Sequence, residues 1–138
     1  VFVFDNDAEG REASEKMSAF RLPSNMGVIL LPEMEALRLF PARGPEGITN
    51  RDINGRAAAI ECYLDLEFGG RPPPSVTWTN YKRDIDTYQG SLDHKETYMR
   101  DFLQQTAETL ADGNYDATKI CVLLDALVAK CHALASAA

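Results

Sequence analysis

The chain has 138 residues, of which 45% are hydrophobic, and a formal net charge of −7 at pH 7. This length is enough for one domain with a buried core. The acidic balance argues against a general nucleic-acid coat protein, because such proteins present a basic surface. A nuclease is not excluded, since bound metal ions offset the negative charge of the carboxylates that hold them. The chain begins without Met, directly in an apolar stretch, so we expect a fragment or a processed chain with further sheet strands upstream.

The first seven residues carry the clearest chemical signal. Four apolar residues, 1–4, run directly into Asp5 and Asp7. Alternate residues of a strand share a face, so both carboxylates are expected on one side of the strand's C-terminal end. Two oxygen ligands at such an end suit Mg²⁺ (or Mn²⁺) and a phosphate-bearing substrate. The alternative is structural: Asp7 caps a helix and Asp5 is a turn residue.

The next segments predict a βαβ unit. Residues 8–20 have helical spacing of apolar positions, and Pro23 ends the helix. Residues 28–31 form a continuous apolar run, typical of a strand buried on both faces. We expect this strand to lie parallel to residues 1–4, because a helix connects them.

The remainder is predicted to be mostly helical. A strong helix is expected over 56–68, followed by a short strand over 76–79, a helix beginning near Ser91 and a last helix N-capped by Asp116. The broad apolar face of the last helix is expected to pack on the preceding helix or on a partner. The fold class is therefore α/β: a partial parallel α/β unit over 1–70, with a helical extension over 71–138 packed on it.

Several segments together resemble one protein family. They comprise residues 3–10, 22–26, 44–47, 52–64, 78–82 and 88–95. The strand, Asp5-x-Asp7, Gly10, helix and second strand look like the second half of a Toprim domain. Taken together, the sequences of these segments resemble the bacterial HEPN/Toprim-associated proteins, which are distantly similar to OLD-type nucleases. No Arg-x4–6-His motif is present, so RNA cleavage of the HEPN type is not expected.

The resemblance implies a Mg²⁺-dependent nuclease module with DNA or RNA as substrate, acting in bacterial defence. In Toprim enzymes two such aspartates bind Mg²⁺, and a glutamate after an earlier strand completes the site. That glutamate would lie upstream of Val1, so the resemblance implies an active site that is incomplete in this sequence. The chain is then an enzyme only if upstream residues complete it.

Two further residues are candidates for the same site. Arg56, Glu61 and Tyr63 resemble a patch after the Toprim strands of OLD-like nucleases, where the glutamate serves a second metal ion. Glu61 also lies beside an apolar stripe, and a buried carboxylate needs a metal or a basic partner such as Arg56. Lys95 would stabilise the charge of a phosphodiester transition state, or it is a solvated helix lysine.

Basic residues would position a nucleic acid through its phosphates. They are Arg51, Arg56, Lys82 and Arg83. Trp78 and Tyr81 would stack on a base, or they pack in the core.

Two other functions compete with the nuclease. A phosphatase of the HAD type also places D-x-D after an apolar strand, but Ala8, Glu9 and Gly10 fit its motif poorly. A non-catalytic Toprim-derived scaffold would instead bind a partner, or a second copy, through the C-terminal helices.

The localisation is expected to be cytoplasmic. No apolar run reaches the ~18 residues of a membrane span, and no signal peptide is visible. Cys62, Cys121 and Cys131 form no C-x-x-C motif. We expect them to be reduced, buried thiols.

Overall fold

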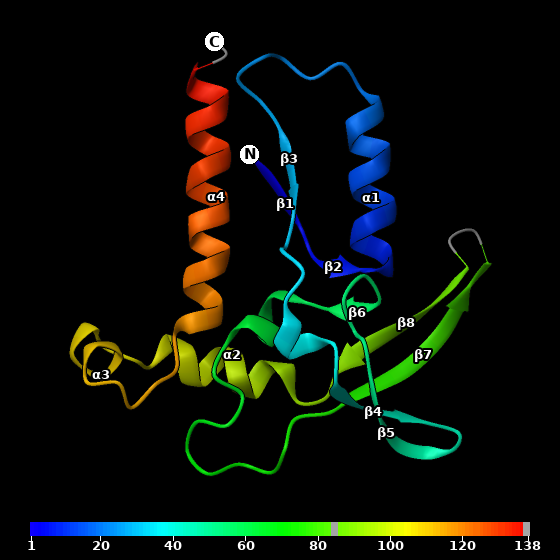
Figure 1. The fold of residues 1–138 in the computed structure, drawn as a ribbon, viewed down its shortest axis with the longest axis vertical. Coiled ribbons are helices and arrows are strands. Elements are labelled where there is room, and N and C mark those ends of the chain that lie inside the picture. The colour runs from blue at the N-terminus through cyan, green and yellow to red at the C-terminus, as the bar shows by residue number, and fades with distance from the viewer. Residues whose placement is uncertain (84–85, 137–138) are drawn as a thin grey trace.

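The structure, a computed structural model, describes residues 1–83 and 86–136. Its first unit is the predicted βαβ: strand β1 (Phe2–Phe4), helix α1 (Ala8–Ala19) and strand β3 (Val28–Leu30) (Figure 1). β1 and β3 are parallel, with Phe2 opposite Val28 and Phe4 opposite Leu30, which confirms the predicted pairing. α1 forms because Asp7 caps its first turn, and it ends at Phe20, before Pro23.

The remaining strands are mostly antiparallel, so the larger parallel sheet of a Toprim-like fold is not what the described residues form. β2 (Asn6–Asp7) continues from β1 and pairs antiparallel with β6 (Ala57–Ala58). A four-stranded sheet has the order β5-β4-β7-β8. Its strands are β4 (Phe40–Gly44), β5 (Gly47–Arg51), β7 (Val76–Lys82) and β8 (Thr87–Leu92). In this sheet only the short contact of β4 with β7 is parallel.

The β4–β5 hairpin was not predicted from the sequence. Its turn joins Gly44 to Gly47, which lie opposite each other. Gly47 has a φ of +92°, a backbone conformation that glycine adopts without the steric cost of a side chain. Gly44, Pro45 and Gly47 therefore belong to a tight turn between two strands.

The helix predicted over 56–68 is wrong. This segment contains β6, one short 3-10 helix, η2 (Ile60–Tyr63), and irregular chain. Non-local contacts compete with the helix: β6 pairs with β2, and the Tyr63 hydroxyl donates to the carbonyl of Pro32 at 2.6 Å. As a result Ile60, expected on the apolar stripe, is 46% exposed.

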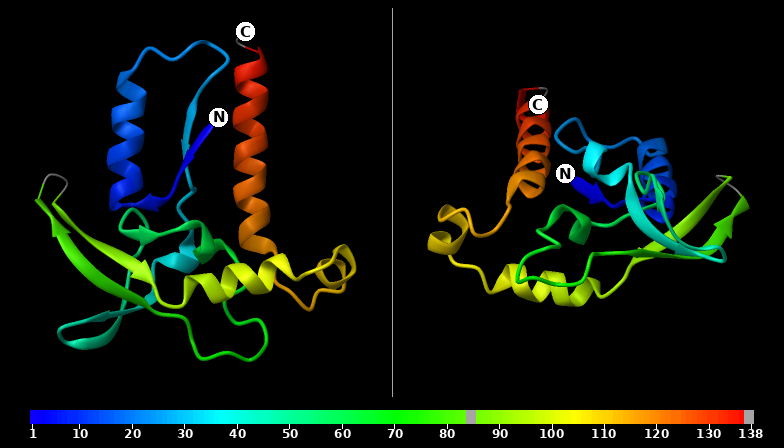
Figure 2. Two further views of the ribbon diagram at one scale, coloured as in Figure 1. Left: turned by 180° about the vertical axis from the view of Figure 1, so that it is seen from behind. Right: turned by 60° about the horizontal axis from the view of Figure 1, so that its bottom comes forward.

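The chain is helical from α2 onward, as predicted, but less continuously, and the expected helical extension over 71–138 also contains β7 and β8. Its helices are α2 (Lys95–Leu103), α3 (Ala107–Ala111) and α4 (Thr118–Ser136); a further 3-10 turn, η1 (Glu35–Leu37), precedes β4. Asp116, the predicted N-cap, accepts a hydrogen bond of 2.9 Å from the Thr118 N–H but lies two residues before the first residue of α4. α4 does not form a helical hairpin with α2. It lies beside the β1–β3 unit, on the opposite side from α1 (Figures 1 and 2).

The core lies where η1, η2, β7 and the start of α4 meet. Its most enclosed side chains are Tyr63, Leu37, Ile53, Val76 and Cys62. α4 contributes Leu123 to this core, and its further turns approach the loop before β3 at Gly27.

Surfaces expected to be buried are partly open. Val1, Phe2 and Val3 are 39–44% exposed, and β3 is only half-buried, in contrast to the prediction of a strand buried on both faces. Cys62 is buried as predicted, but Cys121 and Cys131, both on α4, are exposed. Within the described residues, no helix is both long and apolar enough to cross a membrane.

Candidate functional site

The acidic pair Asp5 and Asp7 lies where β1 ends and α1 begins. Asp5 is half-buried, and its Oδ1 accepts a hydrogen bond of 3.0 Å from the Ile60 N–H. This bond joins the N-terminal unit to η2, more than fifty residues later in the chain. Gly10, in the first turn of α1, lies so close to Asp5 that an added Cβ would overlap its carbonyl oxygen. The backbone therefore holds the acidic pair tightly against the helix.

Asp7 has the capping role that the sequence left open as the alternative. Its Oδ1 accepts from the Gly10 N–H at 2.6 Å. Its Oδ2 accepts from Nε2 of Gln89, on β8, at 3.1 Å. Each oxygen has a second lone pair, so capping and cation binding by this carboxylate are compatible.

The fold brings Glu61 and Lys95 to the neighbourhood of Asp5. Burial raises the pKa of the Asp5 carboxyl, and the carboxylates of Asp7 and Glu61 raise it further. The Ile60 N–H and the Lys95 ammonium act in the opposite direction. Three acids and one lysine, from three distant segments, thus share one electrostatic environment. Glu61 reaches it from η2, not from the helix that the sequence predicted.

These residues fit part of a divalent cation site. Carboxylate oxygens are the ligands that Mg²⁺ prefers, and a cation would relieve the repulsion that raises the Asp5 pKa. However, in the part of the chain that the structure describes, no three His, Cys, Asp or Glu side chains are grouped closely enough to hold a metal ion.

The four basic candidates do not share one surface. Arg51, at the end of β5, and Arg56 line one cleft together. Lys82, on β7, forms an ion pair of 2.9 Å with Glu9 of α1. Arg83 follows β7 and is exposed. Of these four residues, only Arg51 and Arg56 therefore line the same cleft.

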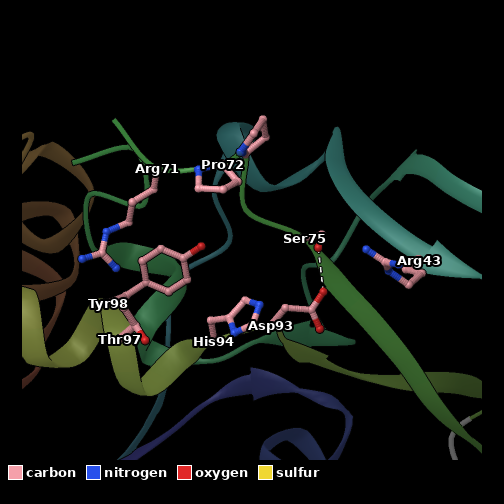
Figure 3. A pocket seen from close by; sticks show the side chains of 9 residues that line it. Arg43, Arg71, Pro72, Ser75, Asp93, His94, Thr97 and Tyr98 are labelled. Carbon is pink, nitrogen blue, oxygen red and sulfur yellow. Dashed lines mark hydrogen bonds between the residues drawn. The ribbon is translucent and has the colours of Figure 1, made fainter. Parts of the chain in front are cut away.

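Another cleft, of about 420 Å³, lies at the start of α2 (Figure 3). Two of its charged groups, Asp93 and Arg71, already have protein partners. Asp93 accepts hydrogen bonds from the hydroxyls of Ser75 and Thr77, at 2.6 and 2.8 Å. Arg71 pairs with Asp101 and lies over the ring of Tyr98. These contacts tie β7 and the preceding loop to α2, which is a structural role.

Sequence reasoning missed two residues beside the acidic pair. They are Gln89, which holds Asp7, and Asn6, which is 2% exposed between the two aspartates. Asn6 Nδ2 and Gln89 Oε1 are buried and find no hydrogen-bond partner among the described residues. Gln89 belongs to one of the segments that carry the family resemblance, and that was the available signal. Asn6 also belongs to such a segment, residues 3–10, but its burial depends on the pairing of β2 with β6.

No family model, no curated protein and no solved structure matches this chain.

Proposed function

We propose that this chain carries the metal-binding half of a Mg²⁺-dependent, Toprim-type phosphodiesterase site that acts on nucleic acid. The supporting observation is the convergence of η2 with the acidic pair: the Ile60 N–H donates to Asp5 at 3.0 Å, and the neighbouring Glu61, together with Lys95, contributes to the electrostatic environment of Asp5. Only Asp5 and Asp7 are near neighbours in sequence, so the convergence is a property of the fold. The parallel β1–α1–β3 unit, with the acidic pair at the carboxyl end of β1, is consistent with a partial Toprim-like arrangement.

The roles follow from charge and position. Asp5 and Asp7 would bind the ion, with Glu61 beside them. When bound, Mg²⁺ supplies a polarised water and offsets charge on the phosphodiester. The Lys95 ammonium, exposed at the first turn of α2, would stabilise the negative charge that develops during cleavage. A further carboxylate from outside this sequence is required to complete the site, as the Toprim resemblance implies.

Isothermal titration with Mg²⁺ and Mn²⁺ tests this proposal. The variants are Asp5→Asn and Asp7→Asn, with Asp112→Asn, an exposed acid at the end of α3, as the matched control. Asparagine caps helices about as well as aspartate, so α1 should persist in Asp7→Asn and circular dichroism should stay unchanged. We expect ion binding in the wild type and in Asp112→Asn, and its loss in the two site variants. Absence of binding by the wild type, or equal binding by all four proteins, would contradict the proposal.

A non-catalytic scaffold is the second candidate, and the outer face of α4 favours it. Leu124 and Val128, one turn apart on this helix, are 50% and 52% exposed. Exposed apolar side chains on one helix face are typical of a helix that docks on a partner or a second copy. Light scattering of the wild type and of Val128→Glu tests self-association. A concentration-dependent dimer that the substitution dissociates supports the scaffold, whereas a monomer at all concentrations removes self-association as its basis.

A further inference from the structure

A cleft of about 420 Å³ lies between the β4–β5 turn and the β7–β8 ribbon, which projects from the molecule in Figure 1. Two aromatic rings, Trp78 and Tyr88, and two guanidinium groups, Arg51 and Arg56, line it. This volume falls within the range of small-molecule sites, ~300–1,000 Å³. The cleft is separate from the acidic pair, and its chemistry is different.

The two rings adjoin each other: Tyr88 is exposed, whereas Trp78 is half-buried and packs partly against the core. Their centroids are 6.5 Å apart and their planes are inclined by 54°. Tyr88 is 56% exposed, and the edge of Tyr81 supports it at 5.1 Å. Trp78 lies against Gly90 of β8, where an added Cβ would be 2.8 Å from its Cε3. Because the planes are inclined, a flat ligand would stack on one ring and meet the other at its edge.

The charges of the cleft favour an anion. Arg51 and Arg56 are both exposed, and neither forms an ion pair with another of the described residues. Glu46 is the acidic residue of the lining, so the formal charge is positive by one. Guanidinium groups bind phosphate oxygens in a bidentate manner, and aromatic faces stack on any base.

The cleft lies on the opposite face of β8 from Asp7. Gln89 points to Asp7, so the neighbouring side chain of Tyr88 projects to the other face. Arg56 joins the two regions, because its backbone bridges to Asp7 while its side chain lines the cleft. A ligand in the cleft is therefore held one strand away from the acidic pair, without blocking it.

We infer that this cleft binds one unpaired nucleotide, with its base stacked on Trp78 or Tyr88 and its phosphate between Arg51 and Arg56. A base within a duplex is stacked on both faces and cannot reach the rings. This inference rests on the proposed function and deepens it, because it assigns single-stranded nucleic acid as the substrate class. Binding here requires no metal ion, so its test is independent of the acidic pair.

The fluorescence of Trp78 is a direct readout, because it is the only Trp in the chain. We expect saturable quenching when the full chain is titrated, in EDTA, with a single-stranded oligonucleotide, and no quenching with the matching duplex. A mononucleotide titration distinguishes the source: equal affinity assigns the cleft to free nucleotides, and weaker affinity assigns it to a strand. Absence of quenching by either, up to about 1 mM and so beyond weak nonspecific binding, would overturn the inference.

Variants identify the contacts. Tyr88→Leu should weaken oligonucleotide binding by about 5-fold or more, at the low end of measured stacking contributions, whereas Tyr88→Phe retains the ring and should bind like the wild type. Arg51→Gln should reduce the salt dependence of log K by about one unit of slope, and Arg21→Gln, outside the cleft, should not. Unchanged affinity in Tyr88→Leu would refute the stacking geometry.

The two proposals can fail separately. Quenching that persists in Asp5→Asn after metal binding is lost supports nucleotide binding in the cleft, whether or not the chain is part of a nuclease. Metal binding without any nucleotide quenching would retain the acidic site and refute the cleft.

Discussion

Gly10 lies where the acidic pair meets α1. We expect its replacement by alanine to lower the stability of the protein, whereas the same substitution usually raises the stability of a helix. In the interior of a helix, Gly→Ala normally stabilises by about 1 kcal/mol, because glycine loses more conformational entropy on folding. Here the added Cβ would overlap the Asp5 carbonyl oxygen and lie 2.9 Å from the carbonyl carbon. These are backbone atoms, so no change of side-chain rotamer relieves the clash.

The expected magnitude follows from overpacking. Inserting a methyl group into a tightly packed site costs about 1–3 kcal/mol, and a fixed backbone neighbour favours the upper end. After subtraction of the helix gain, we expect Gly10→Ala to lower the free energy of unfolding by about 2 kcal/mol. The first turn of α1 would shift, and with it the 2.6 Å bond from the Gly10 N–H to Asp7.

Urea denaturation followed by circular dichroism measures this effect. Gly44→Ala is the matched control, because its Cβ would meet only Trp78 Cδ1, at the ordinary contact distance of 3.5 Å. We expect the control to unfold at the wild-type midpoint or slightly above it. A Gly10→Ala midpoint equal to or above that of the wild type would refute the close approach of α1 to Asp5.

The pKa of Asp5 and the packing of α4 give two more predictions. Burial and nearby carboxylates raise the pKa of Asp5 in the folded state above its unfolded value of 3.8. Between the unfolded and the folded pKa, the folded state therefore binds more protons than the unfolded state. The contribution of Asp5 to stability therefore falls as the pH rises through this window. Asp5→Asn should have a higher urea midpoint than the wild type at pH 7, and the difference should disappear below about pH 3.8. A lower midpoint of the variant at pH 7 would contradict this reasoning. Leu123→Ala should cost about 2–5 kcal/mol, because Leu123 is 6% exposed, whereas Leu124→Ala, at a site 50% exposed, should change stability by less than about 0.5 kcal/mol. Equal urea midpoints for the two leucine variants would show that α4 does not pack as described.

Local patterns were sufficient for the first unit and the last helix. Apolar runs predicted β1 and β3, the helical spacing of apolar positions predicted α1, and the βαβ connection implied the parallel pairing of the two strands. The apolar periodicity over the last twenty residues predicted α4. In these segments the backbone hydrogen bonds are made within the element or with a close neighbour, so sequence pattern and structure agree.

The segment around Glu61 shows where local patterns fail. Its composition is helical, with three consecutive alanines, Ala57 to Ala59. The backbone instead pairs with β2, and the Ile60 N–H donates to Asp5, more than fifty residues away. Helix propensity differs by only a few tenths of a kcal/mol between common residues, so such tertiary contacts outweigh it.

The sequence by itself determined which side chains were available: two aspartates after an apolar strand, a downstream glutamate and lysine, and scattered arginines and aromatic residues. Only the tertiary structure decided which of them meet. It placed Glu61 and Lys95 in the environment of Asp5, gave Asp7 its contact with Gln89, and separated Lys82 from the cleft of Arg51. The physical reason is that these meetings depend on antiparallel pairings between distant segments, and their register is set by the packing of the whole core, which no local pattern encodes.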